Sequence, residues 1–140
     1  MKKSLLLLVL TIGFISCGGK DQSHQIPFIT GYWEIKSVEM PDGTLKEFTV
    51  STSIDYITVQ ADSGVRKKLM PRLDGTFREF PTSEKFKFVQ QNDSLYMFYE
   101  TPFANWKEAV IKADEQEFVV KNNNGIYAYK RFKNLDLKTE

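Results

Sequence analysis

The sequence predicts an all-β fold, an up-and-down antiparallel β-barrel of about eight strands, and three observations support this prediction. Aromatic residues make up 14% of the 140 residues, a proportion that suits strands better than helices. Beyond residue 30, short runs rich in aromatic and β-branched residues alternate with turn-forming residues at the spacing typical of sandwiches and barrels. These runs lack the 3.6-residue apolar periodicity of a helix.

The expected strands follow one another along the chain with short connections. We expect them at 31–39, 53–60, 65–72, 83–90, 94–100, 105–112, 116–121 and 126–132. Turn dipeptides such as Asp74-Gly75 separate them and tolerate the positive φ angles of tight hairpins. Short turns favour a meander over a Greek key, and closure into a barrel removes exposed sheet edges. Residues 41–52 are the expected place for a short helical turn, and Pro71 predicts a bulge or a sheet edge.

The first segment predicts export from the cytoplasm. A basic start at Lys2 and Lys3 precedes an apolar stretch that ends before Cys17, and a membrane-spanning helix needs a longer stretch of about 20 residues. A basic start, a short apolar core and small residues at the end are typical of a secretory signal peptide, here residues 1–16. Cys17, the single cysteine, stands at its boundary. The alternative is an unmodified, buried cysteine beside an ordinary cleavage site.

Phe14-Ile15-Ser16-Cys17 resembles the lipobox of bacterial lipoproteins, with Phe14 in place of the usual leucine. The resemblance implies cleavage before Cys17, diacylglycerol on its thiol, and an acyl chain such as palmitate on the new amino group. Several acyl chains anchor a protein stably in a membrane. At the position after the cysteine the chain has Gly18 rather than aspartate, and in this it resembles lipoproteins that are sent to the outer membrane. We therefore expect a lipid-anchored protein of the bacterial cell envelope, on its periplasmic or surface face.

Three segments are expected after the signal peptide. Residues 17–30 are small and polar and predict a flexible tether, in which His24 would be solvated. Residues 31–133 hold the expected strands and form the barrel domain. Residues 134–140 form a polar tail.

Two short motifs carry a resemblance to a known family. Gly31-Tyr32-Trp33 opens the first strand with the G-x-W signature of lipocalins and related calycin barrels, and Arg131 lies in the last strand, where such barrels often have an arginine. The chain resembles the lipocalin-like lipoproteins of bacterial envelopes over about residues 31–133. The resemblance implies that Trp33 packs across the closed end of the barrel and that Arg131 lies over it, as a structural plug with a cation–π contact.

The run 94–100 is apolar on both faces, which permits two interpretations. In the first, one face fills the core and a loop partly covers the other. In the second, an apolar ligand site lies at the barrel mouth, and its candidate residues are Tyr96, Phe98, Phe103 and Trp106. The loop 101–105 would then be a natural lid.

Charge and residue counts exclude several classes of function. The chain has 19 basic and 18 acidic residues, whereas a nucleic-acid-binding protein normally has a clear basic excess. One histidine and one cysteine exclude disulfide scaffolds, Cys-rich zinc sites and paired-His metal sites, so we expect no metal and no cofactor. Nucleophile elbows and Gly-rich phosphate loops do not occur in the sequence, and we expect no catalytic residues.

Basic residues follow one of the expected strands at a spacing of two or four. Arg66, Lys68 and Arg72 would share a face, and if that face points outward beside Lys85 and Lys87, these residues form a basic stripe. The stripe is either an ordinary solvated barrel exterior or a contact for anionic headgroups, acidic glycans or an acidic partner.

The sequence leads to a hypothesis with one alternative. The hypothesis is a non-enzymatic outer-envelope lipoprotein whose lipocalin-like barrel binds a small hydrophobic or amphipathic ligand. The alternative is a structural or adaptor lipoprotein with a filled barrel, which binds another envelope protein through its surface. An open cavity favours the hypothesis, and a filled interior favours the alternative.

Overall fold

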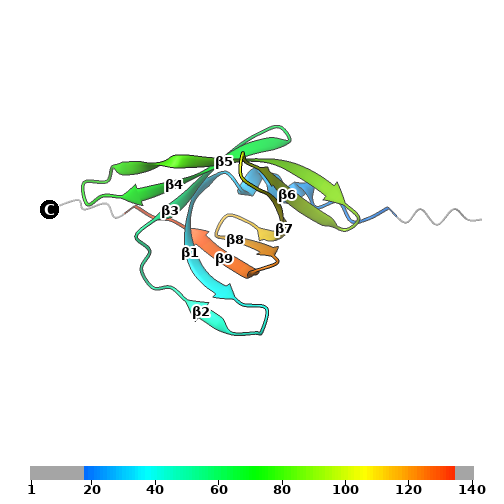
Figure 1. Ribbon diagram of the computed structural model, residues 1–140, viewed down its shortest axis with the longest axis horizontal. Coiled ribbons are helices and arrows are strands. Elements are labelled where there is room, and N and C mark those ends of the chain that lie inside the picture. The colour runs from blue at the N-terminus through cyan, green and yellow to red at the C-terminus, as the bar shows by residue number, and fades with distance from the viewer. Residues whose placement is uncertain (1–17, 135–140) are drawn as a thin grey trace, which may run out of the picture.

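Nine strands and one short helix make up the described part of the chain, residues 18–134 of the computed structural model (Figure 1). The helix, η1, is a 3-10 helix at Ser23–Phe28. The strands are β1 (Gly31–Glu39), β2 (Leu45–Glu47), β3 (Ile54–Gln60), β4 (Ser63–Pro71), β5 (Phe77–Gln91), β6 (Ser94–Glu100), β7 (Asn105–Ala113), β8 (Glu117–Asn122) and β9 (Gly125–Arg131). Within residues 18–134, no helix has the length and apolarity needed to cross a membrane.

The strands close into the expected up-and-down antiparallel barrel. Each strand from β3 to β9 pairs with its neighbour in sequence, and β9 pairs back with β1, from Trp33 opposite Arg131 to Glu39 opposite Ile126. Eight strands form this ring. The short β2 adds to the far end of β1, where the sequence predicted a helical turn within 41–52. That prediction is wrong.

The strand β5 is longer than expected, because its first part extends a hairpin with the end of β4. Phe77 pairs with Pro71, and the register shifts between Lys67 and Leu69, where residues 80–82 have no partner on β4. The bulge that Pro71 predicted therefore lies a few residues earlier, and Pro71 itself ends its strand. The two long strands cross one side of the barrel in Figure 1.

The segment before β1 is not the flexible tether that the sequence predicted. From residue 23 it folds as η1, and two of its side chains are buried: Gln25, whose Oε1 accepts a hydrogen bond from Ala113 N at 2.8 Å, and Ile29. Residues before the helix also contact the barrel, since Lys20 N donates to Asp93 Oδ1 at 2.6 Å. The signal peptide and Cys17 lie outside the described residues.

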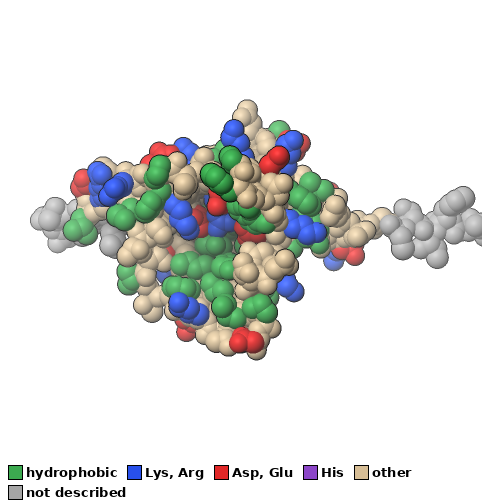
Figure 2. Space-filling model, in the orientation of Figure 1, with side chains coloured by type: hydrophobic (Ala, Val, Ile, Leu, Met, Phe, Trp, Pro, Cys, Tyr) green, Lys and Arg blue, Asp and Glu red, His purple; other side chains and the backbone are tan. Residues whose placement is uncertain are grey.

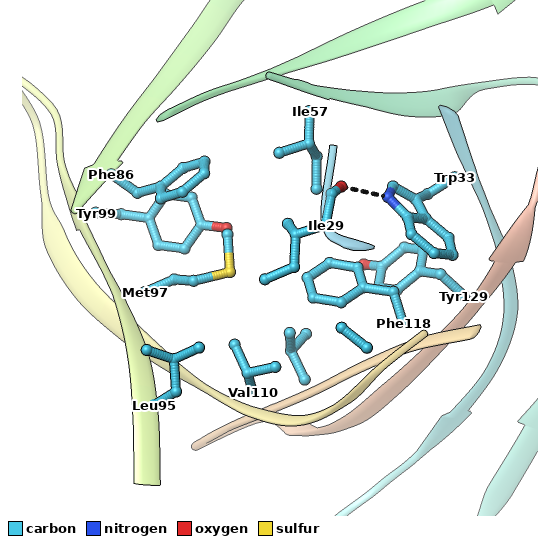
Figure 3. Packing of buried hydrophobic residues seen from close by; sticks show 12 residues of the cluster. Ile29, Trp33, Ile57, Phe86, Leu95, Met97, Tyr99, Val110, Phe118 and Tyr129 are labelled. Atoms are coloured by element: carbon cyan, nitrogen blue, oxygen red, sulfur yellow. Dashed lines mark hydrogen bonds between the residues drawn. The ribbon is translucent and has the colours of Figure 1, made fainter. Parts of the chain in front are cut away.

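The core fills the barrel around its closed end, where η1 lies (Figure 3). Every second residue of a strand points into this core. On β6, for example, Leu95, Met97 and Tyr99 point inward. The twelve buried residues of the cluster are Ile29, Trp33, Ile57, Phe86, Leu95, Met97, Tyr99, Val110, Ala113, Phe118, Val120 and Tyr129. Side chains therefore occupy most of the space in which a larger barrel would hold a ligand.

Candidate functional site

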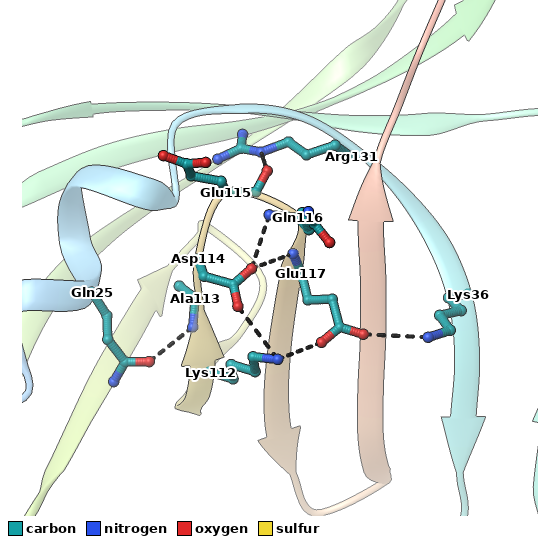
Figure 4. Close-up of polar contacts among 9 residues, drawn as sticks. All are labelled: Gln25, Lys36, Lys112, Ala113, Asp114, Glu115, Gln116, Glu117 and Arg131. Atoms are coloured by element: carbon teal, nitrogen blue, oxygen red, sulfur yellow. Dashed lines mark hydrogen bonds and ion pairs between the residues drawn. The ribbon is translucent and has the colours of Figure 1, made fainter.

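Trp33 and Arg131 meet at the closed end of the barrel. The Trp33 ring is fully buried, and its Nε1 donates to the Ile29 carbonyl at 2.8 Å. The Arg131 guanidinium lies 3.8 Å from the Trp33 ring centroid. It donates hydrogen bonds to three main-chain carbonyls, those of Phe28, Thr30 and Glu115; Figure 4 shows the bond to Glu115. Arg131 thus connects the segment before β1 with the β7–β8 turn while its guanidinium lies over the Trp33 ring.

Gly31, the first residue of the G-x-W motif, makes this approach sterically feasible. Its φ is +138°, a conformation that residues with a side chain rarely adopt. A Cβ at this position would lie 2.2 Å from Arg131 Nη1. Glycine is therefore required here for two reasons: it adopts the positive φ, and it has no Cβ that would collide with Arg131.

The other end of the barrel opens into a mouth of about 260 Å³. Its lining comes from β3, β4, β5, β7, β8 and β9 and mixes charged with aromatic side chains. Figure 2 shows one face of the molecule, on which basic and acidic side chains are interspersed and also lie together in a central hollow. The chain has a formal net charge of +1, and on that face its basic and acidic side chains do not gather into separate areas of one sign.

A buried charged cluster forms the floor of this mouth, and Arg66 is its centre. The Arg66 side chain points into the barrel. Its Nη2 donates to Asp55 Oδ2 and to Tyr129 Oη, both at 2.8 Å. Its Nη1 donates to Tyr99 Oη at 3.2 Å and to Glu108 Oε1 at 3.4 Å. Five strands therefore meet through one guanidinium group.

The inward orientation of Arg66 corrects the expected outward basic stripe. Gly64 rather than Val65 faces the core, because a Cβ at Gly64 would lie 2.3 Å from the Phe86 ring. Arg66, two residues on, then points inward as well. Lys68 lies at the edge of the cluster, with Nζ 2.7 Å from Asp55 Oδ1. Other members of the stripe, Arg72, Lys85 and Lys87, are exposed as expected.

The two carboxylates of the cluster ionise differently. Burial alone would raise the pKa of Asp55, but Arg66 and Lys68 outweigh it and hold that pKa below its usual value. Burial raises the pKa of Glu108, Arg66 only partly offsets this, and repulsion from Glu84 adds to it. Burial also raises the pKa of Tyr129 to about 12, so its hydroxyl is neutral near pH 7.

Comparison with known proteins gives the fold family. Residues 29–120 match the family described as "Lipocalin-like domain". The chain belongs to this lipocalin-like family. No curated protein matches the chain. Among solved structures, it is similar to a lipocalin-like protein from Bacteroides uniformis, with 12% identity and a TM-score of 0.46, over 74% of this chain and 97% of the other. An uncharacterized protein from Bacteroides eggerthii is similar with 9% identity and a TM-score of 0.47, over 74% and 98% of the two chains.

The structure of this lipocalin-like domain separates the four expected ligand-contacting residues. Trp106 lines the mouth and stacks on Tyr99, with ring centroids 4.9 Å apart and planes at 6°. Tyr96 and Phe98 lie on the outer face of β6, because the alternate positions of that strand fill the core. Phe103 is 97% exposed in the β6–β7 turn. These four residues do not form one site, and Trp106 is the one that lines the mouth.

A second hollow, of about 970 Å³, lies on the outer face of the lipocalin-like domain. It crosses β3, β4, β5 and β6 and reaches Asn105 at the start of β7. Outward-facing side chains border it, together with the core residues Phe86 and Tyr99. Val65 and Phe98 supply apolar surface, and Lys85, Lys87 and Glu100 supply charge. We call this hollow the outer groove.

The buried cluster was not predicted from the sequence, although the positions of two of its members indicate buried carboxylates. Glu108 lies between Trp106 and Val110 at a spacing of two, and Asp55 precedes Ile57 at the same spacing. Both carboxylates therefore fall on the apolar faces of their strands, and a buried carboxylate needs a buried partner. Within the described part of the chain, no group of three or more His, Cys, Asp or Glu residues could hold a metal ion.

Proposed function

We propose that this protein is a lipid-anchored binding protein of the bacterial outer envelope, not an enzyme, and that it takes a small amphipathic ligand in the barrel mouth. The observation that carries the proposal is the mouth itself, an opening of about 260 Å³ that ends on buried charged groups. Charged groups at the base of a partly aromatic pocket can orient a ligand, and its apolar walls can desolvate it.

The size and lining of the mouth favour a small ligand with a polar group. Sites for drug-sized ligands are about 300–1,000 Å³, so the mouth suits a smaller molecule. The Trp106 and Tyr127 side chains supply aromatic surface, whereas Arg66, Glu84 and Glu108 supply charge. A purely apolar ligand would leave these polar groups without partners, which is unfavourable. This refines the earlier expectation of a hydrophobic or amphipathic ligand.

The proposed anchor is a lipid on Cys17. The lipobox-like run before it and Gly18 after it support this assignment. Because Lys20 N binds Asp93 in the β5–β6 turn, an anchored Cys17 would hold that turn near the membrane. Mass spectrometry of the protein from bacterial membranes should show a diacylglycerol and a fatty acyl chain on a chain that begins at Cys17. Cys17→Ala should remove both modifications and release the protein from the outer-membrane fraction. An unmodified Cys17 in the wild type would refute the anchor.

Native mass spectrometry tests the ligand site. Residues 18–140 contain every described element, and their native mass should exceed the denatured mass when envelope extract has been added. Trp106→Ala removes an aromatic wall of the mouth and should abolish the added mass. Phe98→Ala truncates an aromatic side chain on the outer face of the neighbouring strand, and this variant should still show the added mass. An added mass lost with Phe98→Ala and kept with Trp106→Ala would move the site to the outer groove.

A second candidate function is that of an adaptor, and the outer groove favours it. The interior is largely filled, whereas the groove measures about 970 Å³ and includes Phe98. In this function, another envelope protein would bind across β4, β5 and β6. Crosslinking from a photoreactive residue at Lys87 should then trap that protein, and crosslinking from Lys121, on the strand β8, should not. Equal crosslinking from both positions would argue against the adaptor.

A further inference from the structure

We infer that the barrel mouth recognises its ligand through an ammonium group and rejects carboxylates and phosphates. The inference rests on the proposed binding site in the mouth and names the chemical class of its ligand, a small organic amine.

The buried arginine of the mouth already directs both of its terminal nitrogens to protein acceptors, so these nitrogens do not offer a site for an anion. Arg66 donates to two carboxylates, those of Asp55 and Glu108, and to two tyrosine hydroxyls. It is only 8% exposed. A ligand carboxylate would have to displace Asp55 or Glu108 and leave that carboxylate buried without its cation, which is strongly unfavourable.

The carboxylates of the mouth, in contrast, have unused capacity. Glu108 is 6% exposed, its Oε1 accepts a hydrogen bond from Arg66 at the long distance of 3.4 Å, and hydrogen bonding from the Trp106 side chain also lowers its pKa. These contacts do not outweigh burial and the repulsion from Glu84, because the pKa of Glu108 remains raised. Glu84 also lines the mouth, is close enough to repel Glu108, and forms no ion pair with any described residue.

The lysines at the mouth do not supply the missing cation. Lys68 Nζ lies 2.7 Å from Asp55 Oδ1, so its charge is directed to the other carboxylate of the cluster. Lys67 Nζ lies 2.7 Å from Glu79 Oε1. Glu84 and Glu108 repel each other, and Arg66 contacts only Glu108 of the two, so this pair of carboxylates attracts a further positive charge.

The remaining walls suit the same ligand. The Trp106 and Tyr127 side chains line the mouth beside Glu108. Aromatic rings attract ammonium groups through the negative potential of their faces, and this attraction grows when water is excluded. An ammonium group donates up to three hydrogen bonds, which Glu108 Oε2 and Glu84 can accept. The volume of about 260 Å³ limits the ligand to a short alkyl or aryl amine.

Three probes of equal chain length test the inference: hexylamine, hexanol and hexanoate. Each is titrated into residues 18–140 at pH 7, with calorimetry for affinity and the indole N–H resonance of Trp106 for location; Trp106→Phe assigns that resonance. Hexylamine should bind at one site and shift the Trp106 signal, and hexanoate should do neither. Glu108→Gln should weaken hexylamine binding at least tenfold. The matched control Glu117→Gln, a carboxylate paired with Lys112 outside the mouth, should leave the affinity unchanged.

The outcomes separate this inference from the proposed function. Binding of hexanoate but not hexylamine at Trp106 would overturn the amine preference and leave the mouth as a ligand site. Equal binding of hexanol and hexylamine, unaffected by Glu108→Gln, would also overturn it, because recognition would then be apolar. Binding of none of the three would refute both the amine preference and the mouth site. Should Glu108→Gln unfold, Glu84→Gln provides the same test.

Discussion

Asp55 and Glu108 face the same guanidinium group from β3 and β7, yet the pKa of Asp55 is lowered and that of Glu108 is raised. The distances explain part of this difference, since Arg66 lies 2.8 Å from Asp55 Oδ2 and 3.4 Å from Glu108 Oε1. The neighbours explain the rest: Lys68 adds a positive charge beside Asp55, whereas Glu84 adds a negative charge near Glu108. The cluster thus contains one structural carboxylate and one that is poorly compensated.

Asp55→Asn should destabilise the fold at pH 7 by about 3–5 kcal/mol, the usual cost of removing one partner of a buried ion pair. Because folding lowers the pKa of Asp55, its contribution is present above the ordinary value of 3.8 and is lost as pH falls through the lowered pKa. The variant and the wild type should therefore converge in strong acid. Urea unfolding between pH 2 and pH 7 measures this, with exposed Asp62→Asn as the control. A difference that does not depend on pH would contradict the ion-pair explanation.

Glu108→Gln should have the opposite pH dependence. Because folding raises the pKa of Glu108, its contribution to stability is fully present below the ordinary value of 4.5 and is lost as pH rises through the raised pKa. At pH 7 the buried negative charge of Glu108 destabilises the fold, so the variant should be more stable than the wild type. The gain should disappear below about pH 4.5. A variant that is less stable than the wild type at pH 7 would show that Arg66 needs both carboxylates.

Gly31→Ala should destabilise the closed end through two separate effects. Strained backbone of this kind costs about 1–3 kcal/mol, and the new Cβ also collides with Arg131. Gly43→Ala is a matched control, since Gly43 has a φ of +87° and nothing within 4 Å of a Cβ. The excess loss at Gly31 measures the collision. Adding Arg131→Ala to Gly31→Ala should therefore cost less than the sum of the two single changes. Strict additivity would exclude the collision.

Gln25→Ala tests whether η1 belongs to the folded barrel. The substitution leaves the buried N–H of Ala113 without its acceptor, which costs about 1–3 kcal/mol. Gln116→Ala, an exposed glutamine in the β7–β8 turn, should change the unfolding free energy by less than about 0.5 kcal/mol. Urea midpoints of the two variants give the comparison. Equal midpoints would mean that η1 does not contribute to the stability of the barrel.

Trp33→Ala should cost about 3–5 kcal/mol, the usual range for an aromatic side chain truncated in a core. The Trp33 ring is fully buried and lies under Arg131. Its centroid is 5.4 Å from the centroid of the Phe118 ring. Trp106→Ala, at the half-buried mouth, should cost less. Thermal unfolding of both variants compares the two ends of the barrel. A larger loss at Trp106 would reverse the assignment of core and mouth.

Strand positions could be predicted well from the sequence, because each strand ends where turn residues interrupt its period-two pattern. The runs 31–39 and 94–100 coincide with β1 and β6. The first part of β5 was missed because Pro81 indicates a break. The structure accommodates Pro81 where the pairing of β4 with β5 is interrupted, so this proline removes no bond from that ladder.

The buried cluster could not be predicted in the same way, because alternation defines two faces of a strand without saying which is inside. On β4 neither face is clearly apolar, since Val65 alternates with Gly64 and Arg66. The choice depends on acceptors that four other strands bring to Arg66 and on the Phe86 ring that fills the space above Gly64. Contacts between distant segments, rather than local pattern, decide the orientation.

The pairing of β1 with β9 has a consequence for how the chain acquires its structure. Trp33 pairs with Arg131 across the junction of the first and last barrel strands, so the barrel closes only after nearly the whole chain is available. Contacts between residues so distant in sequence slow folding, and domains dominated by them fold in about milliseconds to seconds. A chain truncated before β9 would leave β1 and β8 as open edges, and such edges pair with other chains. Premature termination before β9 should therefore yield aggregates, whereas a chain that includes β9 pairs it with β1 and leaves neither strand as an open edge.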